Sequence, residues 1–181
     1  MEAKIICKSV RDLTDPILEQ VEKTYTESFP EAERRDFALV RNLLAQEPKF
    51  FLQAILKDEQ YVGFITCWKF EGYTYAEHFA IDPAARNGGI GAKVLKQFLE
   101  SCGTPVVLEV EMPTDEMSRR RIGFYERLGF VLDNHYYRQP PYRSNGEWLE
   151  MKLMTYGDLN LSHTFEQIKT DIYTHVYGFK S

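Results

Sequence analysis

A cluster of glycines, Gly88-Gly89-Ile90-Gly91, follows Arg86 and Asn87 near the middle of the 181-residue sequence. The glycines leave a run of backbone N–H groups uncovered by side chains, just before a stretch that predicts a helix. The first amides of a helix lack intrahelical partners and lie at the positive end of its dipole, so they attract anions. With the charge of Arg86 beside them, these amides predict a pyrophosphate site. A turn that only connects a strand to a helix is the alternative.

Two common phosphate-binding motifs do not match the spacing of these glycines. The dinucleotide motif G-x-G-x-x-G needs a third glycine at an offset where this sequence has none. The ATP- and GTP-binding loop G-x-x-x-x-G-K-[ST] needs a Ser or Thr after its lysine, and neither follows Lys93. The predicted pyrophosphate site therefore belongs to a different class of ligand.

Carboxylates on two predicted strands are candidates for general acid–base chemistry. Glu77 lies in the strand that leads into the glycine cluster, and Glu109 lies in the next strand along the chain. Because side chains alternate along a strand, Glu109 shares a face with Val107 and Glu111, and His78 is expected on the face opposite Glu77. A charge in a β-branched run is costly to bury unless it is paired. Partial burial of a carboxyl group raises its pKa, which suits a base that works near neutrality.

The surrounding pattern predicts the elements that hold these residues. Asp58-Glu59 is expected to turn a tight hairpin, and Ser118 is expected to cap a helix that ends at Gly129. Hairpin-connected strands followed by strands that alternate with helices predict an α/β fold (α+β in detail), with a mixed, mostly antiparallel sheet flanked by helices. Strands are expected at 5–12, 50–57, 60–70, 75–81, 106–112, 130–137 and 147–155, and helices at 14–28, 36–47, 92–102, 118–128 and 165–176.

Length and composition indicate a single domain of residues 1–181, with 157–181 as a C-terminal helical extension. The formal net charge of −5 at pH 7 argues against binding of a nucleic-acid backbone. No apolar stretch approaches the roughly 20 residues that span a bilayer, and the N-terminus lacks a signal-peptide pattern, so a cytoplasmic protein without a membrane partner is expected. Three widely spaced cysteines predict reduced thiols and no metal site: Cys7, Cys67 and Cys102.

Two motifs of this sequence resemble those of the GNAT superfamily of N-acetyltransferases. Arg86-x-x-Gly89-x-Gly91, placed after Ile81-Asp82-Pro83, is similar to the acetyl-CoA signature of that family. Gly123–Phe130 is similar to the second hallmark of the family, F/L-Y-x-x-x-G-F, which ends its last core helix. The order of elements from about Ile5 to Thr155 also matches. Leu108-Glu109-Val110 is similar to a strand of the members that acetylate the N-terminus of ribosomal proteins.

The resemblance implies acetyl-CoA as the co-substrate and no metal. The pyrophosphate of coenzyme A would lie on the backbone amides of the glycine cluster, and the preceding strand end would pair its backbone with the pantetheine amides. Ser118 stands where many members have Asn, and Arg119–Arg121 would either meet the 3′-phosphate of the coenzyme or form a solvated basic turn. The cofactor-binding residues implied in this way are Phe79, Ala80, Ile81, Arg86, Asn87, Gly88, Gly89, Ile90, Gly91, Ala92, Ser118 and Tyr125.

The resemblance also implies direct transfer of the acetyl group to a primary amine in a ternary complex. Tyr125 matches the tyrosine that members use near the departing thiolate, so it is the expected general acid; core packing is the alternative for this side chain. Glu109 is favoured as the general base over Glu77, and Glu111 or an ordered water is the third choice.

The acceptor is left open by the sequence. A small-molecule or peptide amine is expected. The candidate classes of acceptor are a protein N-terminus, a lysine, a polyamine and a small metabolite. Aromatic residues in the segments 135–137 and 140–142, with Trp148, would hold an amine by cation–π contact, or pack the hairpin or a dimer interface. A monomer or a homodimer is expected. The alternative function is a catalytically silent, GNAT-like module that binds or senses acetyl-CoA.

Overall fold

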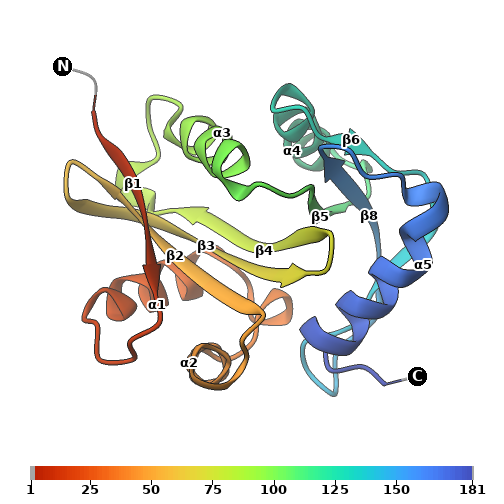
Figure 1. Cartoon of the computed structure of the whole chain (residues 1–181), viewed down its shortest axis with the longest axis horizontal. Coiled ribbons are helices and arrows are strands. Elements are labelled where there is room, and N and C mark those ends of the chain that lie inside the picture. The colour runs from red at the N-terminus through yellow and green to blue at the C-terminus, as the bar shows by residue number, and fades with distance from the viewer. Residues whose placement is uncertain (1–2, 181) are drawn as a thin grey trace. The chain divides into compact units, whose positions relative to one another are not determined.

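The structure of the protein is a computed structural model that describes residues 3–180 (Figure 1). Its strands are β1 (Ile5–Val10), β2 (Phe50–Lys57), β3 (Gln60–Phe70), β4 (Tyr73–Ile81), β5 (Val106–Glu111), β6 (Val131–Leu132), β7 (Tyr137–Gln139) and β8 (Leu149–Tyr156). Its α-helices are α1 (Ile17–Ser28), α2 (Phe37–Gln46), α3 (Ile90–Cys102), α4 (Glu116–Arg127) and α5 (Leu161–Asp171). Short 3₁₀ turns form η1 (Glu31–Glu33) and η2 (Pro83–Ala85), and a π-helical turn forms η3 (Ile172–Val176).

The strands form an eight-stranded mixed sheet of order β1-β2-β3-β4-β5-β8-β6, and β7 also pairs with β8. The pairs β1–β2, β2–β3, β5–β8, β6–β8 and β7–β8 are antiparallel. β4 and β5 run parallel, with Thr74 opposite Val106 and Tyr75 opposite Val107. The predicted α/β fold with a mixed, mostly antiparallel sheet and flanking helices is therefore confirmed.

The described residues fall into two compact units. The first contains the chain up to Lys69 together with Ala76–Ser101, and the second contains Phe70–Tyr75 together with the chain from Cys102 onwards. The boundary therefore divides β4, whose first three residues belong to the second unit. The predicted single domain of residues 1–181 stays a prediction.

In the first unit, α3 covers one face of the strands, and α1 and α2 cover the other (Figure 1). The β2–β3 hairpin turns at Asp58 and Glu59, whose φ angles of +49° and +68° suit a two-residue turn that matches the twist of the strands. The core between the sheet and α3 contains Ile55, Val62 and Ile81 from the strands and Ile90 and Val94 from the helix. The face towards α1 packs the rings of Tyr25, Phe29, Phe37, Phe64 and His78.

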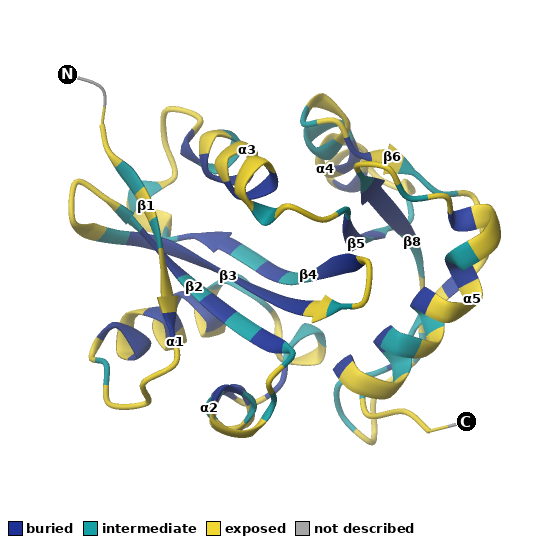
Figure 2. Ribbon diagram, viewed as in Figure 1, coloured by how far each residue is buried: buried dark blue, intermediate teal, exposed yellow. Residues whose placement is uncertain are grey.

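In the second unit, β8 lies between β5 on one side and β6 and β7 on the other. A buried stripe runs along α5 and continues into η3 (Figure 2). Its residues recur at helical spacing, as an amphipathic helix requires: Leu161, Phe165, Ile168, Ile172 and Val176. The predicted C-terminal amphipathic helix is confirmed and begins earlier than expected, at Leu161.

One predicted strand is wrong, because residues 130–137 form two short strands and not a continuous one. β6 pairs Leu132 with Met154, and β7 pairs Tyr137 with Met151. The chain between them has more residues than the facing stretch of β8, so it must bulge. The Asp133 carboxylate accepts a hydrogen bond from the His135 backbone N–H and closes a local turn there.

Candidate functional site

The predicted site residues divide between the two compact units. Glu77 and residues 79–92 lie in the first unit, and Glu109, Ser118 and Tyr125 lie in the second. In the first unit the strand end, the glycine cluster and the start of α3 follow one another directly in the chain.

The glycine cluster forms an exposed, left-handed turn before α3. Gly88 and Gly89 have φ angles of +75° and +70°, a conformation that side-chain-bearing residues rarely adopt. A Cβ atom added to either glycine would meet no heavy atom within 4 Å, so their backbone faces open space. α3 begins at Ile90 and not at Ala92 as predicted, and the buried Ile90 side chain packs with Ile81 and Val94. The turn therefore presents the first amides of a firmly packed helix.

Arg86 is held beside this turn by two hydrogen bonds. Its Nε donates to the Ile81 carbonyl oxygen at 2.9 Å, and its Nη2 donates to Ser28 Oγ at 3.1 Å. The guanidinium is thus fixed between the end of β4 and the end of α1. Asp82 stabilises the same corner, because its carboxylate accepts from Ala84 N–H at 3.0 Å and from Thr24 Oγ1 at 3.1 Å.

The end of β4 lies tightly against β3. Phe79 and Ile81 contribute to the core towards α3, and Ala80 is buried. A Cβ atom at Gly63 would lie 2.4 Å from the Ala80 carbonyl oxygen, so only glycine permits this approach of the two backbones. The strand end that the resemblance assigns to pantetheine is therefore packed closely against β3.

Glu77 is a buried ion-pair partner. Its Oε1 lies 2.7 Å from Arg35 Nη2, and its Oε2 accepts a 3.0 Å hydrogen bond from Trp68 Nε1. Burial raises the pKa of Glu77, but the Arg35 charge, the neighbouring His78 and the hydrogen bonds from Arg35 and Trp68 together hold the pKa below its ordinary value. The backbone N–H of Arg35 also donates to Tyr25 Oη. The pair therefore ties the connection between α1 and α2 to the sheet.

The expected alternation of Glu77 and His78 is wrong. Glu77 bonds Arg35 and Trp68, while the His78 ring packs against Tyr25 at 5.1 Å, and Arg35 itself bonds Tyr25. Both side chains thus lie on the face of the sheet that α1 and α2 cover. At this point of the strand, the His78 backbone N–H donates to the Thr66 side-chain oxygen. Burial lowers the pKa of His78, so its ring is neutral near pH 7.

In the second unit, Glu109 lies at the centre of a polar cluster. Its Oε1 accepts from Tyr137 Oη at 2.5 Å, and its Oε2 accepts from Gln139 Nε2 at 2.5 Å and from Tyr177 Oη at 2.7 Å. The sequence placed Tyr137 only in an aromatic hairpin and missed Gln139 and Tyr177 altogether. No local pattern marks these two residues, since they lie 30 and 68 positions from Glu109.

Glu111 is a weaker candidate for chemistry. Its carboxylate lies 3.7 Å from Arg121 Nη1, and both side chains are about half exposed. The other two arginines of this basic run, Arg119 and Arg120, are also exposed, and Arg120 pairs with Glu116 at 2.7 Å. The predicted contact of the run with a 3′-phosphate stays a prediction.

The start of α4 differs from the prediction, because Asp115 and not Ser118 is the N-terminal capping residue. The Asp115 carboxylate accepts from Ser118 N–H at 2.7 Å, and Ser118 Oγ accepts from Asp115 N–H at 3.2 Å. These reciprocal bonds form a capping box, which two residues three apart can share. Ser118 is 2% exposed and its hydroxyl is engaged within the helix terminus. Its predicted contact with the cofactor stays a prediction.

Tyr125 lies near the end of α4 among aromatic rings. Its ring centroid is 5.4 Å from that of Phe124 and 5.5 Å from that of Phe130, and its carbonyl oxygen accepts from Phe130 N–H. Gly129, with φ at +101°, ends the helix as predicted. Burial raises the pKa of the Tyr125 hydroxyl, so it carries its proton at neutral pH and is able to donate it.

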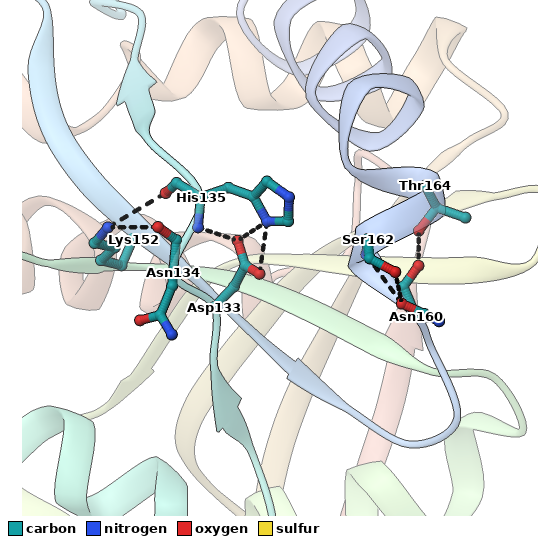
Figure 3. A network of polar contacts seen from close by, with 7 residues as sticks. All are labelled: Asp133, Asn134, His135, Lys152, Asn160, Ser162 and Thr164. Carbon is teal, nitrogen blue, oxygen red and sulfur yellow. Dashed lines mark hydrogen bonds and ion pairs between the residues drawn. The ribbon is translucent and has the colours of Figure 1, made fainter.

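A separate surface hollow of about 440 Å³ lies beside β6 and the start of α5. Figure 3 shows polar side chains of this region and the hydrogen bonds between them. Asp133 accepts from the His135 backbone and lies 2.9 Å from the His135 ring nitrogen, and Asn160 caps α5 by accepting from Ser162 N–H. Lys152 Nζ donates to the His135 carbonyl oxygen. These contacts serve local structure.

Among residues 3–180, no group of three or more His, Cys, Asp and Glu side chains is placed to hold a metal ion. Over the same residues, no helix combines the length and the apolar character that a bilayer crossing requires.

Comparison with known proteins gives consistent matches. The model of the Acetyltransferase (GNAT) family matches residues 14–130. A Bacteroides thetaiotaomicron protein assigned to the GNAT acetyltransferase family is 38% identical, with a TM-score of 0.91, over 98% of this chain and 99% of that one. The Escherichia coli ribosomal-protein-S18-alanine N-acetyltransferase is 18% identical, with a TM-score of 0.56, over 84% of this chain and 93% of that one. Arabidopsis thaliana Naa50 in complex with a CoA–peptide bisubstrate analogue is 20% identical, with a TM-score of 0.59, over 84% of this chain and 98% of that one. No curated protein matches the chain.

Proposed function

The chain belongs to the GNAT family of acetyltransferases, and from this premise we propose that it transfers an acetyl group from acetyl-CoA to a primary amine. The observation that carries the proposal is the left-handed turn at Gly88 and Gly89, which leads directly into α3. A helix N-terminus with uncovered amides suits the two charges of a pyrophosphate.

The proposed donor site follows the first unit of the chain. The amides from Asn87 to Ala92 bind the pyrophosphate, with Arg86 fixed beside them. The backbone of Phe79–Ile81 pairs with the pantetheine amides in the manner of an added strand. Ser118 acts by fixing the start of α4, which carries Tyr125.

The proposed chemistry uses one base and one acid. Glu109 accepts a proton from the amine, the nitrogen lone pair forms the new N–C bond as the C–S bond breaks, and Tyr125 gives its proton to the sulfur. Three hydrogen bonds to Glu109 support a carboxylate that is held in one orientation. Glu77 remains the rival base, although its ion pair with Arg35 supports a structural role. Glu111 or an ordered water is the third choice.

The proposed acceptor is a small-molecule or peptide amine. Aromatic rings near Glu109 support binding of a cation: Tyr142 packs on Tyr177 at 4.9 Å, and Trp148 packs on Tyr173 at 5.5 Å. The proposal includes a cytoplasmic location and an assembly that is either a monomer or a homodimer. The second candidate function, an acetyl-CoA sensor without catalysis, shares the donor site and differs in turnover alone.

Calorimetric titration with acetyl-CoA, combined with an assay of thiol release, tests the proposal. The variant Gly89→Glu places a negative charge at the pyrophosphate, so its affinity should fall by about 100-fold or more. Gly72→Glu is the matched control, because Gly72 is also an exposed left-handed glycine in open space but lies in the β3–β4 turn.

The outcomes separate the two candidate functions. Unchanged affinity in Gly89→Glu would refute the pyrophosphate site. Binding by the wild type without thiol release from an alanine-terminated peptide, lysine, spermidine or a small primary amine would favour the sensor.

A further inference from the structure

The C-terminal segment brings a tyrosine to the proposed base. Tyr177 Oη donates to Glu109 Oε2 at 2.7 Å, across 68 positions of sequence. Gln139 Nε2 donates to the same carboxylate oxygen at 2.5 Å and to Tyr177 Oη at 2.8 Å. The three side chains form a closed triangle in which the Tyr177 oxygen accepts from Gln139 and its own proton is directed at Glu109.

The backbone places Tyr177 there by a π-helical turn. α5 continues into η3, and Tyr177 N–H donates to the Ile172 carbonyl oxygen at 3.3 Å, a five-residue step. A π turn contains one residue more than an α turn, which changes the side chain that follows on the buried face. Such turns are frequent at functional sites, and this one ends at the residue that bonds Glu109.

The segment around Tyr177 is anchored on both sides. Before it, Tyr73 Oη donates to Asp171 Oδ2 at 3.0 Å, and Tyr173 Oη donates to the Arg138 carbonyl oxygen. After it, Phe179 N–H donates to the Tyr173 carbonyl oxygen at 2.8 Å. These contacts would hold the segment without the Tyr177 hydroxyl, so that hydroxyl is not needed as an anchor.

We propose that Tyr177 is a positioning residue for Glu109, so that the C-terminal segment is part of the catalytic centre. This inference rests on the proposed acetyl transfer. A carboxylate that accepts several directed hydrogen bonds is held in one orientation, which a base requires at the moment of proton transfer. Tyr177 acts through Glu109, with Gln139 and Tyr137 as its neighbours in the same cluster.

Steady-state kinetics of Tyr177→Phe and Glu109→Gln, alone and combined, test the proposal. The assay is thiol release with whichever of lysine, spermidine or an alanine-terminated peptide the wild type acetylates. Tyr177→Phe should lower kcat by about tenfold and leave the KM for acetyl-CoA unchanged. Because Tyr177 acts through Glu109, adding Tyr177→Phe to Glu109→Gln should cause no further loss. Losses that multiply would overturn the inference.

Tyr73→Phe is the matched control. Tyr73 also donates a buried hydroxyl to a carboxylate, and its partner Asp171 lies in the same C-terminal segment, yet it does not bond Glu109. The kcat of Tyr73→Phe should stay within about twofold of the wild-type value. This substitution removes an anchor of the segment but keeps the hydrogen bonds among Glu109, Gln139 and Tyr177. Equal losses in Tyr73→Phe and Tyr177→Phe would show that the segment acts only through its stability, which contradicts the inference.

Hydrogen exchange gives a readout that needs no turnover. In Tyr177→Phe the amides of residues 172–179 should exchange within about twofold of the wild-type rate, because the other anchors still hold the segment. Much faster exchange there would show that the hydroxyl is an anchor, which would overturn the inference. Absence of wild-type turnover would overturn the proposed function and the positioning role together, whereas normal turnover with an unaffected Tyr177→Phe would overturn the positioning role alone.

Discussion

Replacement of Glu77 by Gln separates a structural carboxylate from a catalytic one. The Glu77 side chain is fully buried, and that of its partner Arg35 is 8% exposed, with 2.7 Å between Oε1 and Nη2. Gln keeps the shape of the side chain and is still able to accept the hydrogen bond from Trp68 Nε1. The change therefore removes one thing, the negative charge opposite the guanidinium.

The size of the effect follows from burial. Removal of one partner from a buried ion pair costs about 3–5 kcal/mol of unfolding free energy, because the other charge stays in a poorly solvated site. For a chain of this size each kcal/mol lowers the melting temperature by about 2–4 °C, so Glu77→Gln should melt roughly 6–20 °C below the wild type. Glu22→Gln is the control, since Glu22 and Arg41 lie 3.5 Å apart and are 48% and 31% exposed. It should cost about 0–1 kcal/mol.

Urea unfolding at several pH values measures the difference in stability between Glu77→Gln and the wild type. Burial raises the pKa of Glu77, but the Arg35 charge and the other charge and hydrogen bonds around the carboxylate together lower it, so the folded-state pKa lies below the ordinary value of 4.5. A lowered folded-state pKa gives stability that is present above the unfolded-state value and is lost as the pH falls through the folded-state value. The difference in unfolding free energy between the wild type and Glu77→Gln should therefore be largest at neutral pH and should become smaller in acid.

Turnover decides the role of the residue. Measured well below its melting temperature, Glu77→Gln should retain kcat within about threefold of the wild-type value, because Glu109 is the proposed base. A variant that unfolds like the wild type but loses about 100-fold or more in kcat would refute this reasoning and identify Glu77 as the base.

Two further variants test the acid and the strand packing. Tyr125→Phe should lower kcat by about 100-fold and leave the calorimetric affinity for acetyl-CoA within about threefold, because it removes a proton donor and keeps the ring; a large loss of affinity would contradict the assignment. Gly63→Ala should lower the free energy of unfolding by about 1–3 kcal/mol in urea, because the new Cβ meets the Ala80 carbonyl oxygen. Gly123→Ala is its control: it lies within α4 in space that a Cβ fits, and it should be neutral or stabilising by up to about 1 kcal/mol.

Local chemistry made several features predictable. The hairpin at Asp58-Glu59, the strand that ends at Ile81, and the helix end at Gly129 agree with the prediction. Each depends on the conformational preferences of a few consecutive residues. The stripe on α5 was also predictable, because burial of one face imposes a spacing that the sequence displays.

Errors arose where two residues compete for one local role or where the strand is irregular. Asp115 and Ser118 both suit a helix terminus, and the capping box uses both, with Asp115 as the cap. Alternation failed at Glu77 and His78, where the His78 backbone N–H donates to the Thr66 side chain. Alternation is a rule for regular ladders, and local irregularity in a strand breaks it.

The sequence by itself determined the family, the fold class and the glycine turn, because motifs and periodicity are properties of contiguous residues. Tertiary structure alone decided what each carboxylate contacts. Glu77 and Glu109 look similar in the sequence, as acids within largely apolar strands. In the structure Glu77 lies against the Arg35 guanidinium, and Glu109 accepts hydrogen bonds from side chains up to 68 positions away. The role of a buried charge depends on its partners, and those partners are brought to it by the fold.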